Sequence, residues 1–212
     1  MKATTGIWLV LAILYASFYY WYTPSGGPLS ADEIRHYSDI LSADTSLKMD
    51  VPAWIKFMET DTGDDFVMFN TVKHRDSPQQ ISGVNPGESS DEVLANYNRP
   101  FIRRAMRSAS HPVLFGTAAA EPLDIWGIDG AGGWTRGGVV RYRSRRDLIE
   151  QIVAMIDGPH IHDLKIAALE KTIAYPLDPW FHLGDPRLIL ASLCLIIGLG
   201  SESIALRRSR HH

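Results

Sequence analysis

Two long runs of mostly apolar residues lie near the two ends of the chain. The first, Gly6 to Tyr22, ends in a cluster of bulky aromatic rings, and the second extends from Leu188 to Leu206. About 17–20 residues of this kind suffice to cross the hydrocarbon core of a bilayer. A cleaved signal peptide would end in small residues, whereas aromatic rings are typical of a membrane interface. We therefore predict a membrane anchor at each end, in preference to a signal peptide and a buried C-terminal helix.

Basic residues next to the two runs predict their orientation. Lys2 precedes the first run, and the arginine-rich segment 207–210 follows the second. Because short positively charged flanks stay in the cytoplasm, both termini are expected there, with residues 23–186 on the far side. For a bacterial protein this describes the inner membrane and a periplasmic central domain. Ala12 and Ala16 are spaced for close helix packing in lipid.

The central segment alternates between strand and helix patterns. The expected strands are 66–72, 112–120, 134–143 and 172–177. Helices are expected after Ser89, which forms a capping box with Glu92, and after Ser144, where an apolar stripe extends to Ile156. A similar capping box at residues 30–33 starts an earlier helix. Residues 51–59 are ambiguous between strand and helix, and residues 75–90 form a long polar loop.

The order strand, helix, strand, strand, helix, strand predicts an α+β, ferredoxin-like βαββαβ domain. The chain is thus divided into an anchor (1–23), a linker with an amphipathic helix (24–63), the α+β domain (64–178) and a second anchor with a basic tail (179–212). Helices would cover one face of the sheet. Apolar residues on both sides of the strands indicate that the other face is covered too, usually by a second sheet from a like subunit.

Several stretches carry a resemblance to a known group of proteins. The segments FVMFNTVKHRD, VLFGTAAAEPL, GGVVRYRSRRDLIEQIV and LKIAALEKTIAYP resemble small uncharacterised members of the dimeric α/β-barrel superfamily, near the EthD-like and NIPSNAP-like domains. The similarity covers about residues 64–178. It implies the fold and says little about activity, because members include small monooxygenases, dehydratase-like enzymes and haem-handling proteins. Two anchors and the insert at 75–90 depart from the usual pattern.

Three polar residues are candidates for lining a cavity of such a barrel. Asn70 shares a strand face with apolar residues, so its amide needs buried partners or a ligand. Arg141 shares a face with Val139 and poses the same question. His74 follows the first strand and could act as a general acid or base. For each, pairing with neighbouring protein groups or solvent is the simpler alternative.

The remaining motifs do not predict metal, cofactor or nucleic-acid chemistry. His160 and His162 would point in different directions at the start of a helix, and no further ligand motif accompanies them. The net charge of -3 does not suggest a nucleic-acid partner. Basic clusters at 103–107 and 143–147 could meet anionic lipid or an acidic partner.

Two functional hypotheses follow. The first is a structural or accessory subunit of a membrane complex, of respiratory or photosynthetic type, or a membrane-anchored dimer. Its partners would be the bilayer and other membrane subunits or a second copy. The second is a small-molecule binder or enzyme that uses the barrel cavity. The first is preferred because the chain has no recognisable catalytic set.

Overall fold

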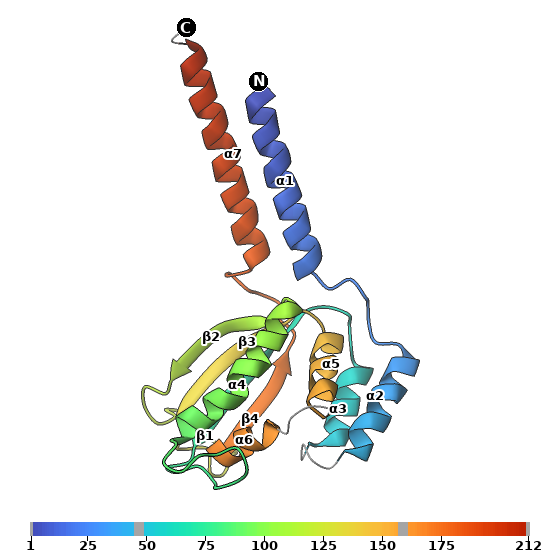
Figure 1. Ribbon diagram of the computed structural model, residues 1–212, viewed down its shortest axis with the longest axis vertical. Coiled ribbons are helices and arrows are strands. Elements are labelled where there is room, and N and C mark those ends of the chain that lie inside the picture. The colour runs from blue at the N-terminus through green and yellow to red at the C-terminus, as the bar shows by residue number, and fades with distance from the viewer. Residues whose placement is uncertain (1, 45–48, 157–160, 211–212) are drawn as a thin grey trace. The chain divides into compact units, whose positions relative to one another are not determined.

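The computed structural model describes residues 2–44, 49–156 and 161–210, which form two compact units (Figure 1). The helical unit contains α1 (Lys2–Tyr22) and α7 (Pro186–Arg210). The sheet unit, residues 26–178, contains the other elements. Its helices are α2 (Ala31–Ala43), α3 (Val51–Glu59), α4 (Ser90–Arg107), α5 (Arg145–Ile156) and α6 (His162–Ala168), and its strands are β1 (Phe66–His74), β2 (His111–Thr117), β3 (Arg136–Tyr142) and β4 (Leu169–Leu177).

Both helices of the helical unit are long and apolar enough to cross a membrane, by length and composition. They pack against each other in antiparallel directions. The Trp8 ring of α1 packs against Gly198 of α7. A Cβ atom at residue 198 would stand only 2.2 Å from this ring, so the contact needs glycine there. Further along, the Cys194 thiol faces the Leu11 carbonyl at 4.0 Å. Most other apolar side chains of α1 and α7 are exposed, which is the pattern of helices that meet lipid.

The sheet is four-stranded and antiparallel, in the order β2-β3-β1-β4. β1 lies in the centre, where Phe66 pairs with Tyr142 of β3 and Val67 pairs with Leu177 of β4. Pro176 is on the edge strand β4, as its missing N–H requires. A register shift between Pro112 and Leu114 marks an irregularity in the other edge strand, β2.

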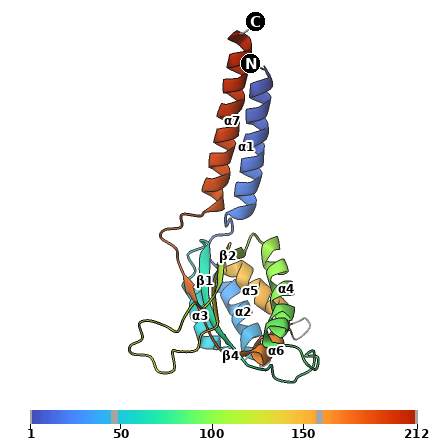
Figure 2. The same ribbon diagram turned by 90° about the vertical axis from the view of Figure 1, so that its left-hand side faces the viewer.

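Helices cover one face of this sheet, and the core lies between them (Figure 2). The Phe66 and Tyr142 rings stack at 5.3 Å on that face, and the apolar stripe of α5 packs against them. Ser89 and Glu92 form the predicted capping box at the start of α4. The Ser144 hydroxyl likewise accepts a hydrogen bond from the Asp147 N–H at the start of α5.

The segment before the sheet is helical and belongs to the same unit as the sheet. Residues 51–59 are helical, with Asp50 as the N-cap. Leu29, Leu41 and Met58 are buried in the same core as the sheet, so α2 and α3 belong to one unit with it. Pro100 lies within α4, and the helix continues through it.

Ile149 tests the assignment of the α5 stripe, because its side chain is fully buried. Ile149→Ala should lower the free energy of unfolding of the full chain by about 2–5 kcal/mol, the usual cost of deleting a buried aliphatic group. Met106→Ala, on the exposed side of α4, is the control and should change it by less than about 0.5 kcal/mol. If the two variants lower the free energy of unfolding equally in chemical denaturation, the assignment of the α5 stripe to the core is wrong.

Candidate functional site

Asn70 lies in the middle of β1, between Gly138 on β3 and Ala174 on β4. The alternation of the strand places it on the helix-covered face, together with Phe66 and the other core residues of β1. Its amide nitrogen donates to the Met68 carbonyl at 3.0 Å. The half-buried amide is therefore satisfied at least in part by its own strand.

His74 ends β1 and is almost completely buried. Its Nδ1 lies 2.6 Å from the Thr135 hydroxyl, and its Nε2 lies 3.2 Å from a carboxylate oxygen of Asp91. Asp91 also accepts from Arg136 at 2.6 Å. Burial lowers the pKa of His74, and Asp91 opposes this effect only in part. The cluster ties β1, α4 and the start of β3 together, and its neutral imidazole suits that structural position.

Arg141 is almost completely buried at the end of β3. Its Nε donates to Asp65 at 2.8 Å, and its Nη1 donates to the Ala109 carbonyl at 2.8 Å. Ala109 has a φ of 53°, a left-handed conformation that is costly for a residue with a Cβ. The guanidinium thus fixes the strained corner between α4 and β2, and its hydrogen-bonding groups are engaged within the protein.

The three candidate residues do not form one site. Asn70 lies on the helix-covered face of the sheet, whereas the register places Arg141 on the opposite face, beside the beginning of β1. His74 is the last residue of β1, so it lies at the end of the strand that is far from Arg141. His162 is half-buried against the Tyr97 ring, and His160 lies outside the described residues. Within the described ranges, no three His, Cys, Asp or Glu side chains gather in a way that could hold a metal ion.

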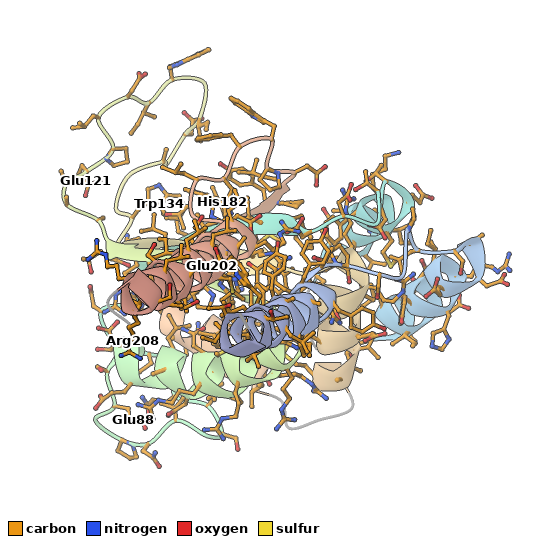
Figure 3. All side chains as sticks on the ribbon, turned by 90° about the horizontal axis from the view of Figure 1, so that it is seen from above. Glu88, Glu121, Trp134, His182, Glu202 and Arg208 are labelled. Atoms are coloured by element: carbon orange, nitrogen blue, oxygen red, sulfur yellow. The ribbon has the colours of Figure 1, made fainter. Side chains whose placement is uncertain are left out.

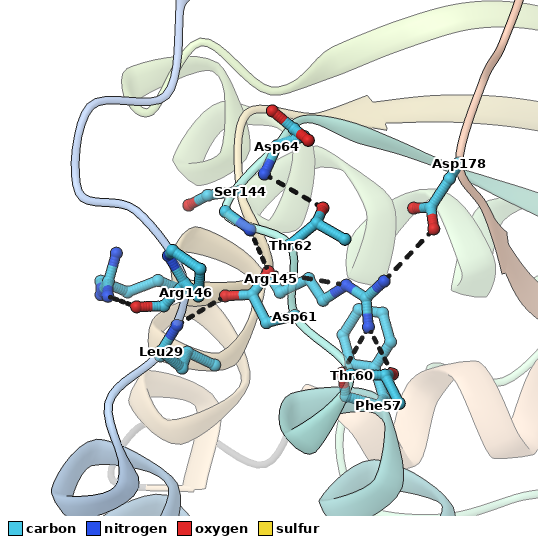
Figure 4. A network of polar contacts seen from close by, with 12 residues as sticks. Leu29, Phe57, Thr60, Asp61, Thr62, Asp64, Ser144, Arg145, Arg146 and Asp178 are labelled. Atoms are coloured by element: carbon cyan, nitrogen blue, oxygen red, sulfur yellow. Dashed lines mark hydrogen bonds and ion pairs between the residues drawn. The ribbon is translucent and has the colours of Figure 1, made fainter.

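A polar network that the sequence did not reveal lies at the start of α5 (Figure 4). Its centre is Asp61, whose side chain is only 2% exposed. The carboxylate accepts from the Leu29 N–H at 2.8 Å and the Gly63 N–H at 3.0 Å, and it lies 3.7 Å from Nε of Arg145. Gly63 has a φ of 82°, and a Cβ there would stand 2.6 Å from the backbone of Gly27. Glycine is therefore required for residues 27–29 to approach.

Arg145 extends this network to Asp178, the last residue of the sheet unit. Its Nη1 donates to the Phe57 carbonyl at 2.5 Å and to the Thr60 hydroxyl at 2.8 Å, while its Nη2 lies 3.5 Å from Asp178. The guanidinium also lies 4.6 Å from the centre of the Phe57 ring. One arginine thus joins α3, α5 and the residue that follows β4.

Arg146 completes the arrangement, which we call the arginine clasp (Arg145, Arg146, Asp61, Glu33 and Asp178). Its Nε donates to Glu33 at 2.8 Å. Its terminal nitrogens donate to the carbonyls of Gly27 and Pro28, each at 3.3 Å. The clasp therefore brings together the first and the last residues of the sheet unit.

One feature of the sequence does point to the clasp. Arg145 and Arg146 occupy the first turn of α5, where the helix dipole disfavours positive charge. Cations in that position require acidic partners, and Asp61 and Glu33 supply them.

The two basic clusters of the sequence lie at the start of α5 and in α4. Arg143 pairs with Asp147 at 2.6 Å, so the 143–147 cluster is engaged within the protein. In the other basic cluster, the Arg104 guanidinium donates to the Ala154 carbonyl at 3.4 Å. Arg103 and Arg107 line a shallow groove on α4 with Ile102 and Met106.

The sheet face opposite the helices is apolar and largely uncovered. Tyr175 and Phe69 make ring contact there at 5.3 Å. The register places the following residues on this open face: Val67, Phe69, Leu114, Val139, Ile173, Tyr175 and Leu177. Leu114, Ile173, Tyr175 and Leu177 are exposed, and the other three are half-buried. This is a contiguous apolar surface of the kind that marks an interaction site.

The helical unit has a polar contact of its own. The Trp8 indole donates to Glu202 at 2.8 Å, which gives a hydrogen-bond partner to a carboxylate in the mostly apolar part of α7. Ala12 and Ala16 are exposed on α1. The expectation that they pack closely against another helix stays a prediction.

No protein-family model and no curated protein matches the chain. Solved structures similar to it include a methylated RPA0582 protein (20% identity, 63% of this chain and 93% of that chain, TM-score 0.49). They also include an RPA0582 protein of unknown function from Rhodopseudomonas palustris (20% identity, 62% and 94%, TM-score 0.46). A third is an uncharacterised NIPSNAP-like domain protein from Burkholderia xenovorans (12% identity, 57% and 90%, TM-score 0.34).

Asp61→Ala tests whether the clasp holds the sheet unit together. It should lower the free energy of unfolding by about 3–5 kcal/mol, because it removes the buried carboxylate beside Arg145 and leaves two backbone N–H groups unsatisfied. Asp64→Ala removes an exposed carboxylate three residues away and should have little effect. Denaturant unfolding followed by tryptophan fluorescence measures both. Equal stability of the two variants would show that the clasp contributes nothing.

Glu33 should make the clasp sensitive to acid. The hydrogen bonds from Arg146 and then from Ser30 lower the pKa of Glu33 from 4.5 to about 2. A lowered pKa gives stability that is complete above the unfolded value and is lost as the pH falls toward the folded value. The stability difference between the wild type and Glu33→Gln should therefore shrink between pH 4.5 and about 2. Asp39→Asn, at an exposed site on the same helix, should show no comparable trend.

Proposed function

We propose that the chain is a bacterial inner-membrane protein with two anchors, whose sheet unit has a structural role as an association domain. Both termini would lie in the cytoplasm and residues 26–178 in the periplasm. The occupant of the open sheet face would be the same face of a second copy. An accessory role within a larger membrane complex would use the same surface and anchors.

The arrangement of the strands supports the finer fold assignment within this proposal. We assign the sheet unit to the ferredoxin-like type, with β1, α4, β2, β3, α5 and β4 as its six elements and α2, α3 and α6 as additions. The order β2-β3-β1-β4 with antiparallel neighbours is the order of a split βαβ sheet. Such a sheet with helices on one face needs a cover for the other.

The open face is the observation that carries the proposal. Four large apolar side chains on it are exposed, although each belongs to a regular strand. At roughly 25 cal/mol for each Å² of apolar surface removed from water, covering them favours association. A two-fold related copy would offer an identical apolar face, and such self-complementary contacts are the commonest in soluble oligomers.

A catalytic role receives less support from the described residues. The side chains of Asn70 and Arg141 lie on opposite faces of the sheet, and Arg141 is bound to Asp65 and the Ala109 carbonyl. A group that acts on a substrate must reach it within hydrogen-bonding distance. Turnover by the purified protein that is lost in Arg141→Ala, with the fold intact, would replace this proposal.

Charged residues on the open face should break the association. In full chains reconstituted in lipid vesicles, Leu114→Asp with Ile173→Asp should weaken self-association at least about tenfold, or about 1.4 kcal/mol, since each buried charge would be unpaired. Thr172→Asp is the matched control, because Thr172 is exposed on the same strand but points to the other face.

Association is measured as energy transfer between two differently labelled populations while the protein is diluted with lipid. Wild-type chains that stay separate at every density would refute the proposal. Equal weakening by Thr172→Asp and by the face variant would refute the assignment of the interface to the open face.

A further inference from the structure

The connection between β2 and β3 is a long arm, residues 118–135, that leaves the sheet on the side opposite α4 (Figures 2 and 3). Its neck is held by backbone hydrogen bonds. The Ala118 N–H donates to Thr135 at 2.9 Å, and the Thr135 N–H donates to Val72 at 2.9 Å. The arm therefore begins and ends at a fixed point beside the end of β1.

The base of the arm is fixed to the side of the open sheet face. Lys171 shares that face with Tyr175 by the alternation of β4. Its ammonium donates to the Gly132 carbonyl at 2.6 Å and lies 4.5 Å from the centre of the Trp134 ring. Glu121 closes the base by accepting from the Gly133 N–H at 2.7 Å. The direction of the arm is thus set by contacts with the sheet.

Beyond this base, the tip of the arm exposes large apolar side chains. Leu123 is 96% exposed and Trp126 is 84% exposed, and Ile125 and Ile128 lie between and after them. A polar loop in water needs no such side chains. Their concentration on one fixed arm, on the same side as the open face, makes the arm a continuation of that apolar surface.

The size of the sheet face explains why an interface would need the arm. Four strands at a spacing of about 4.8 Å, paired over seven residues of about 3.4 Å each, offer roughly 450 Å². A stable interface buries about 800 Å² on each partner. A buried aromatic side chain alone contributes about 150–250 Å². The four apolar side chains at the tip can supply the missing area.

We infer that the arm of each copy reaches across the two-fold axis and packs Leu123 and Trp126 against the second copy. This inference rests on the proposed pairing of the sheet faces and assigns its periphery to a specific segment. The open faces would form the centre of the interface. The arm of each copy would contact the other copy at the end of its sheet.

The test uses the full chain in lipid vesicles and the energy-transfer measurement described above. Leu123→Ser with Trp126→Ser should raise the protein density needed for half-maximal association by about 10- to 100-fold. The monomer should stay folded, since both side chains are exposed. Trp180→Ser with Leu183→Ser removes the same two residue types at exposed sites outside the sheet unit and should leave association unchanged.

A second measurement locates the tip directly. In a chain with Cys194→Ala and Trp126→Cys, an environment-sensitive dye at position 126 should shift to the blue as the protein density rises. A blue shift at the highest dilution would place the arm in lipid, and no shift at any density would exclude a second copy as its partner. Either result overturns the inference.

The two proposals fail in different ways. If the face variant abolishes association while the arm variant behaves as wild type, the inference on the arm is wrong and the proposed pairing stands. If both pairs of serine substitutions weaken association equally, the effect reflects general loss of hydrophobic surface and the arm has no specific role. If wild-type chains never associate, the proposed function itself is wrong.

Discussion

Asp61 is a buried carboxylate that joins the beginning of the sheet unit to the start of α5. It accepts the N–H of Leu29 at the beginning of the sheet unit and pairs with Arg145, which in turn reaches Asp178 after the last strand. Burying these charges is costly unless each is paired and hydrogen-bonded. The positions of α2, α3 and the start of α5 therefore depend on one another through this carboxylate.

A consequence is that both attachment points of the sheet unit lie at the same end of the sheet, where Leu177 pairs with Val67. The arm between β2 and β3 leaves from the opposite end, where Val72 and Thr135 meet. The two ends of the sheet thus differ in what they carry. The first and last residues of the sheet unit lie at one end. The other end carries the arm, with its exposed apolar side chains, beside the open sheet face.

Local signals in the sequence predict local structure well. The capping boxes at Ser30 and Ser89 start helices in the structure, and alternation places Asn70 on the same face as Phe66. Residues 51–59 could not be decided, because a short apolar run fits a strand and a helix equally. Long-range pairing was not predictable, because nothing in the local pattern connects Arg141 with Asp65 or Arg145 with Asp61. Arg141 became a candidate because it shares a strand face with Val139, and its partners Asp65 and the Ala109 carbonyl come from distant parts of the sequence.

The edge position of β4 gives the molecule a mechanical weak point. Among the described strands β4 pairs with β1 alone, and its last residues lead directly into the segment before α7. A pull on that segment would act along the strand end and open the ladder one hydrogen bond at a time, beginning where Pro176 has no N–H to give. The Arg145–Asp178 ion pair is the contact that would bear such a load first. Tension carried along the chain from α7 would thus reach the clasp before it reaches the sheet.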